Sequence, residues 1–129
     1  MQHLPRPVEM LYAKMMDSMI YKILPREAWM AACDHGLYQG SADDLRDGFI
    51  HFSTASQVPA TLERHFAGQK NLVLAAFSAA SLGEALKFEP SRKGELFPHL
   101  YAPLDPALAV KVHAINLDAA GEFILPPLA

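Results

Sequence analysis

The central stretch of the chain, residues 47–54, alternates apolar and polar side chains after a turn dipeptide. Asp47-Gly48 predicts a tight turn, because glycine adopts a positive φ without steric cost. Side chains of a strand alternate between its two faces, so Phe49, His51 and Ser53 share one face. The residues between them are more apolar and predict a core-facing side. We therefore expect a strand that presents an imidazole and a hydroxyl on its other face.

Four more segments have the pattern of strands. Residues 72–77 are continuously apolar, which is typical of a strand that is covered on both faces, and we expect them to be the most buried strand. Residues 20–24 form a short apolar run, and residues 85–89 end at a proline. Residues 110–115 alternate between two faces, with the valines on one of them.

Apolar side chains at spacings of three and four predict helices. The first covers residues 8–19, and the second begins near Pro25, where a missing N–H has no cost. Trp29 and Cys33 would lie on the inner face of the second helix, with Cys33 as a small core residue.

A third helix is predicted to begin at a cap formed by Thr54 or Ser56 and to end near residue 66. Residues 39–48 and 91–106 are rich in glycine, proline, serine and aspartate. These residue types favour turns, so we predict that both segments are loops.

Composition narrows the class of protein. A chain of 129 residues that is 51% hydrophobic and 19% charged is long and apolar enough for one folded domain. A net charge of −3 without a basic cluster argues against an extended nucleic-acid surface. Cys33 is the single cysteine, and no apolar run has the length of a membrane span. We expect a soluble, cytoplasmic protein that makes no membrane contact.

Several separated blocks follow one another in a recognisable order: Ile20-Tyr21-Lys22-Ile23, Trp29, residues 47–53, Gln57, His65-Phe66, Glu89-Pro90, residues 94–101 and Pro103-Leu104. Together they resemble the bacterial domain-of-unknown-function family 952. The resemblance covers residues 20–117 and leaves residues 1–19 as an N-terminal extension, predicted to be helical. Residues 118–129 would then be a C-terminal tail.

The resemblance implies a fold and a class of ligand. The family looks like a small relative of the ADP-ribosyltransferase fold, a single α+β domain with split sheets and flanking helices around a cleft. In the enzymes that cleft holds NAD, so the resemblance implies NAD or a related nucleotide as ligand, with glycosyl or phosphoryl transfer as the chemistry. The first strand carries Tyr21 and Lys22 where the enzymes have arginine or histidine.

The candidate catalytic residues are His51, Ser53, His99 and Glu89. Cleavage of an N-glycosidic bond passes through an oxocarbenium-like transition state, which a carboxylate such as that of Glu89 stabilises. His51 and His99 each have a polar neighbour two residues on, Ser53 and Tyr101, and in a strand this spacing keeps both on one face. We therefore expect His51 and His99 to line one cleft.

The candidate ligand-binding residues are aromatic or basic. Tyr21 and Tyr101 offer surfaces on which a base or nicotinamide ring can stack. Lys22 and Arg92 are candidate phosphate partners, since the planar guanidinium bonds two phosphate oxygens at once. The histidines and cysteine do not have the spacing of known metal-binding motifs, so no metal is expected.

Each candidate also has a structural explanation. His51 and His99 could bond backbone carbonyls, Glu89 could pair with Arg92 across a turn, and His65 could cap a helix end. The alternative function is accordingly a non-catalytic module that binds a small ligand or a protein partner in the same cleft. A carboxylate within reach of a bound ribose would favour the enzyme.

Overall fold

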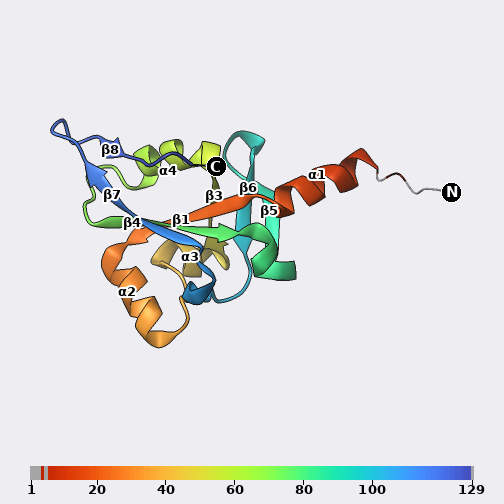
Figure 1. Ribbon diagram of the computed structural model, residues 1–129, viewed down its shortest axis with the longest axis horizontal. Helices are drawn as coiled ribbons and strands as arrows, with labels where there is room; N and C mark the ends of the chain where they lie inside the picture. Colours follow the sequence, from red (N-terminus) through yellow and green to blue (C-terminus); the bar gives the residue numbers. More distant parts are fainter. Residues whose placement is uncertain (1–3, 5, 129) are drawn as a thin grey trace.

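Two antiparallel sheets form the framework of the computed structural model, which describes residue 4 and residues 6–128 (Figure 1). The larger sheet has the strand order β3-β1-β4-β7-β8, and its strands are β1 (Met19–Pro25), β3 (Ser53–Thr54), β4 (Leu72–Ser78), β7 (Lys111–Leu117) and β8 (Phe123–Ile124). The smaller sheet has the order β2-β6-β5, with β2 (Ile50–His51), β5 (Leu86–Pro90) and β6 (Leu96–Leu100). The helices are α1 (Pro7–Met16), α2 (Arg26–His35), α3 (Ala42–Asp47) and α4 (Val58–His65).

Strand β4 lies at the centre of the larger sheet and is buried on both faces, as its apolar run predicts. Val73, Ala75 and Phe77 belong to one hydrophobic cluster, which α2 and the smaller sheet cover. Leu72 and Leu74 belong to a second cluster under α4 and the C-terminal segment. Figure 1 shows α2 and α4 on opposite sides of this sheet. The expected single α+β domain is confirmed at this level.

The central stretch forms two short strands instead of one, because it crosses from one sheet to the other. Strand β2 pairs with β6 in the smaller sheet, and β3 pairs with β1 in the larger one. Between them Phe52 is buried and packs edge-on against Phe77, with ring centroids 5.8 Å apart. The backbone N–H of Phe52 donates to the Pro98 carbonyl at 3.0 Å. This crossing joins the two sheets at the position where the candidate histidine lies.

The segment 39–48 was expected to be a loop, and this is wrong, because it contains α3. Ser41 accepts a hydrogen bond from the Asp44 N–H at 3.1 Å, and Asp44 accepts one from the Ser41 N–H at 2.9 Å. This reciprocal capping box begins the helix. Gly48 ends it with φ +86°, so the predicted glycine turn is present. The helix lacks an apolar stripe, since Leu45 is exposed, and periodicity could not reveal it.

The segment 91–106 was also expected to be a loop, but β6 lies within it as the middle strand of the smaller sheet. Proline is normally excluded from central strands because it has no N–H to donate. Pro98 takes part through its carbonyl, which accepts from Phe52. The neighbours Phe97 and His99 are buried, so tertiary packing outweighs the local propensity.

One side-chain orientation differs from the expectation. Cys33 is exposed, because α2 packs through Ala28, Trp29 and Ala32 instead. In β7 the buried face carries Ile115, whereas the valine face is exposed to solvent.

The chain ends differ in how they relate to the body. Residues Phe123, Leu125 and Leu128, assigned to the tail, pack against the second hydrophobic cluster. Helix α1 has no buried residue and extends away from the sheets in Figure 1. Within the described residues no helix is long and apolar enough to cross a membrane.

Candidate functional site

A cleft of about 430 Å³ lies where the two sheets meet. Its walls are α3, the crossing between β2 and β3, the C-terminal end of α4, the turn before β6, and parts of β1 and β6. The lining side chains are mainly charged or polar, including three histidines and several carboxylates and arginines. These groups come from elements that are far apart in the sequence, so the tertiary fold alone assembles them.

Asp44 on α3 is the hub of one wall. Its Oδ2 accepts from Lys22 Nζ at 2.9 Å and from the Ser41 N–H at 2.9 Å. Its Oδ1 accepts from the His51 N–H at 3.1 Å and lies 2.6 Å from His51 Nδ1. Burial would raise the pKa of Asp44, but the bonds from His51, Lys22 and Ser41 together hold it well below its usual range. The carboxylate is therefore ionised at neutral pH.

Lys22 reaches the cleft from β1 but is fully engaged there. Its ammonium donates to Asp44 Oδ2 and to the His51 carbonyl, each at 2.9 Å. Burial lowers the pKa of Lys22, while the charge of Asp44 raises it. Because its charge is balanced inside the wall, Lys22 braces α3 against β1 and β2.

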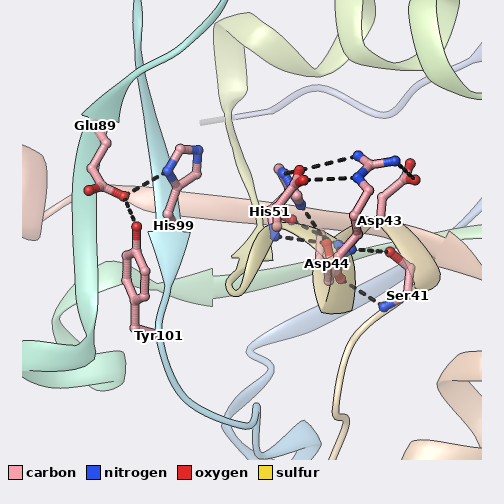
Figure 2. Close-up of polar contacts among 10 residues, drawn as sticks. Ser41, Asp43, Asp44, His51, Glu89, His99 and Tyr101 are labelled. Carbon is pink, nitrogen blue, oxygen red and sulfur yellow. Dashed lines mark hydrogen bonds and ion pairs between the residues drawn. The ribbon is translucent and has the colours of Figure 1, made fainter.

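His51 lies between the carboxylates of Asp44 and Asp47, and Figure 2 shows it beside Asp44. Nδ1 faces Asp44, and Nε2 is 2.9 Å from Asp47 Oδ2. Arg46 in turn donates to Asp47 through Nε at 3.0 Å. Both ring nitrogens of His51 are thus close to an acceptor, and the side chain remains partly exposed at the cleft surface.

His99 on β6 forms a second carboxylate–histidine pair (Figure 2). Its Nδ1 is 2.9 Å from Glu89 Oε1, and the Tyr101 hydroxyl donates to the same oxygen at 2.6 Å. Phe49 stacks on the imidazole with ring centroids 4.0 Å apart. Burial lowers the pKa of His99, and the bond to Glu89 opposes this effect. Hydrogen bonds from Tyr101 and His99 lower the pKa of Glu89.

One end of the cleft is basic. Arg64 and His65 come from the end of α4, and Arg92 comes from the turn before β6. Neither arginine makes an ion pair within the part of the chain that the structure describes; the Arg92 guanidinium lies 5.2 Å from the centroid of the Phe97 ring. Burial lowers the pKa of His65, and the charges of Arg92 and Arg64 lower it further. The two guanidinium groups of this end therefore carry positive charge that no ion pair among the described residues balances, while the charge of Asp43 acts on His65.

The structure brings most of the predicted site residues together. His51 and His99 line the same cleft, with ring centroids 5.7 Å apart, as we expected. The other predicted residues on its wall are Tyr21, Lys22, Ser53 and Arg92.

The remaining predicted residues lie beside the cleft. Glu89 and Tyr101 stand behind His99, and Glu89 bonds these two side chains instead of forming the expected pair with Arg92. The Ser53 hydroxyl is buried and lies 3.1 Å from Thr61 Oγ1.

Sequence reasoning missed Asp44, Asp47 and Arg64. The pattern Ser41-x-x-Asp44 is a capping-box signature, and it would have placed a helix start and an inward carboxylate in the presumed loop. The predicted helix places Arg64 near its C-terminal end, but it does not predict that the Arg64 side chain lines the cleft. Within the described residues no group of three histidines, cysteines or carboxylates could hold a metal ion.

Comparison with known families tests the resemblance seen in the sequence. The profile of the family described as Protein of unknown function (DUF952) matches residues 23–112. The chain belongs to the DUF952 family. The match includes α3, both candidate histidines and the two arginines of the basic end, whereas α1 lies outside it.

Solved structures of a similar protein confirm the fold of this DUF952 chain. The crystal structure of CC0527 from Caulobacter crescentus is 48% identical, with a TM-score of 0.79, and the match covers 83% of this chain and 94% of that one. The solution NMR structure of CC0527 is 50% identical, with a TM-score of 0.72 and coverage of 80% and 89%. No curated protein matches the chain.

Proposed function

We propose that the cleft binds a phosphate-bearing nucleotide of the NAD type and that His51 and His99 serve glycosyl or phosphoryl transfer. The observation that carries this proposal is the pair of arginines at one end of a polar cleft, Arg64 and Arg92, which form no ion pair with any residue that the structure describes. Guanidinium groups suit phosphate because their planar fork bonds two oxygens at once. A volume of about 430 Å³ is within the range of small-molecule sites.

The other end of the cleft is acidic and suits a positively charged part of a ligand. Asp43, Asp44 and Asp47 gather there, and Arg46 and Lys22 balance part of their charge. NAD has an anionic diphosphate and a cationic nicotinamide ring, so its two parts match the two ends. A simple phosphate would use the basic end alone.

The arrangement of two sheets around a cleft supports a relationship to the ADP-ribosyltransferase fold, and we include that relationship in the proposal. The carboxylates nearest to a ribose at the acidic end would be Asp44 and Asp47. Glu89 lies behind His99, so we assign it to this imidazole and not to the sugar. Ser53 and Tyr21 complete the wall on the side of β1 and β3.

Thermal unfolding of the full chain with NAD, ADP-ribose or inorganic phosphate tests this function. A ligand that binds the folded state stabilises it by about 2.7 kcal/mol at a hundredfold excess over its Kd. For a domain of this size we expect a rise in Tm of several degrees with NAD and ADP-ribose.

The variants R92Q and R64Q should lose most of this rise in Tm. The matched control is K93Q, because Lys93 is the exposed neighbour of Arg92 and does not line the cleft. Equal shifts in R92Q and K93Q, or no shift of the wild type at millimolar ligand, would refute the proposal. A retained shift without turnover would favour the non-catalytic binding module.

A further inference from the structure

One ring nitrogen of His99 is close enough to a carboxylate for a hydrogen bond, and the other has no hydrogen-bond partner among the described residues. Nδ1 is 2.9 Å from the Glu89 carboxylate, which can only accept, so Nδ1 carries the proton. Nε2 makes no hydrogen bond within the described residues, yet every buried side-chain nitrogen and oxygen there has a partner. Nε2 is therefore accessible to solvent, and the accessible surface of His99 faces the cleft. Figure 2 shows this nitrogen on the side of the ring away from Glu89.

Besides the bond to Glu89, two further contacts help to hold the imidazole in this orientation. Tyr101 donates to the same Glu89 oxygen at 2.6 Å, which holds the carboxylate in place. Phe49 stacks on the ring with centroids 4.0 Å apart, and this contact opposes rotation of the imidazole. A neutral imidazole that donates one N–H to a carboxylate and presents the other lone pair is the arrangement of a general base.

His51 does not offer the same lone pair. Its Nδ1 faces Asp44 at 2.6 Å, and its Nε2 lies 2.9 Å from Asp47. The charged groups that act on His99 are Glu89 from β5, His51 from β2 and Asp47 from the end of α3. Burial keeps His99 neutral at pH 7 by lowering its pKa, which the bond to Glu89 only partly offsets.

Nε2 of His99 is also placed beside the basic end. Phe97 and His99 lie on one face of β6, and both line the cleft. Residues two apart in a strand are about 7 Å apart. Arg92 lies over the Phe97 ring, so a phosphate held by Arg92 is next to the space in front of His99.

We propose that His99 Nε2 is the general base for the hydrolysis of a phosphate ester, a step that rests on the phosphate-binding role proposed for Arg92. His99 takes one proton from a water molecule as the water oxygen forms a bond to phosphorus. The bond between phosphorus and the ester oxygen breaks, and the alcohol leaves with its electron pair and takes a proton from solvent. His99 then releases its proton to solvent. Glu89 and Tyr101 are positioning residues for this step.

Long-range ¹H–¹⁵N spectra of the full chain, uniformly labelled with ¹⁵N, test the base directly. At pH 7 the free protein should show His99 with a protonated Nδ1 and an unprotonated Nε2. Vanadate, which adopts the five-coordinate geometry of phosphoryl transfer, should convert Nε2 to the protonated form. The H99N variant identifies the signal, and its amide can still donate to Glu89.

Two variants separate the base from a structural role. H99N should weaken vanadate binding by about tenfold or more, because the interaction belongs to the transition state, and should leave inorganic phosphate binding within about twofold. E89Q should lower the pKa of His99 further and mix its two tautomers, since the carboxylate that fixes Nδ1–H is lost.

The possible failures are distinguishable. A free protein with the proton on Nε2, or vanadate that shifts the arginine side-chain signals without changing His99, overturns the general base and leaves nucleotide binding intact. Vanadate that binds nowhere overturns the phosphate-ester chemistry, whereas the thermal-unfolding experiment with nucleotides still decides the proposed function separately.

Discussion

The carboxylate of Asp44 connects the stability of the fold to the geometry of the cleft. It accepts hydrogen bonds from Lys22 on β1, from the Ser41 cap of its own helix and from His51 on β2. The side chains of Asp44 and Lys22 are almost fully buried, at 2% and 6% exposed. A buried ion pair contributes little net stability, but removing one partner leaves a buried charge without compensation.

We predict that D44N destabilises the protein by about 3–5 kcal/mol, because Lys22 then keeps an unpaired charge in a buried site. Urea unfolding followed by circular dichroism measures the change. The control D43N removes an exposed carboxylate on the same helix, which pairs with Arg46, and should change the free energy of unfolding by about 1 kcal/mol or less. The double variant K22M/D44N should recover part of the loss. Equal effects of D43N and D44N would contradict this account.

At the scale of elements, the stability of α3 depends on the contacts at its two ends, because the rest of the helix buries little surface. It is six residues long, and Asp44 is its one buried residue. The chain enters it through Gly40, whose φ is +116° and whose backbone passes close to Asp44. A Cβ on Gly40 would lie 2.8 Å from the Asp44 Cβ. The approach of this loop to the helix therefore needs glycine for two reasons, backbone conformation and space.

We predict that G40A destabilises the fold more than G36A does. Gly36 ends α2 with φ +88°, and a Cβ there would meet nothing within 4 Å, so G36A measures the cost of the backbone conformation alone, about 1–2 kcal/mol. G40A adds the overlap with Asp44, which costs a further 1–3 kcal/mol, roughly the cost of overpacking. Thermal unfolding of both variants gives the comparison. Equal losses would show that the loop yields without disturbing Asp44.

At the scale of the whole molecule, the larger sheet is covered on both faces. The charged cleft lies where this sheet meets the smaller one. The two hydrophobic clusters lie on either side of β1 and β4, and residues of β1, of β6 and of the crossing between β2 and β3 line the cleft. Several titratable groups at this junction have their pKa lowered by folding: Asp44, Glu89, His65 and His99. All four shifts act on stability in the same direction.

We predict that the protein loses stability as the pH falls from 7 to 5. A histidine whose pKa is lower in the folded state binds fewer protons there than in the unfolded chain, where the pKa is about 6.5. Its contribution is therefore fully present above that value and declines as the pH falls through it. Below about pH 4 Asp44 and Glu89 add a second loss of the same sign. Urea unfolding at each pH measures the slope, which H99N should reduce between pH 7 and 5. An unchanged slope in H99N would argue against a buried, neutral His99.

Local signals were sufficient for the strands and helices that carry a strong apolar pattern. The continuous apolar run of β4 predicted a doubly covered strand, and the alternation of residues 47–54 placed Ile50 and Phe52 in the core. The positive φ of Gly48 followed from the turn dipeptide. The blocks of the sequence also identified the DUF952 family, which its profile confirms. These features depend on side-chain periodicity and backbone sterics, which neighbouring residues alone determine.

Tertiary structure decided where the charges meet. Helix α3 lacks an apolar stripe, so the role of Asp44 appears only when Lys22 and His51 arrive from β1 and β2. Strand β6 contains Pro98 and forms because both of its neighbours and the core below it outweigh local propensity. The pairing of His99 with Glu89 and Tyr101, in place of the expected pair of Glu89 with Arg92, follows from the register of β5 against β6. Hydrogen bonds and ion pairs between distant segments depend on how strands align, and a linear pattern does not contain that information.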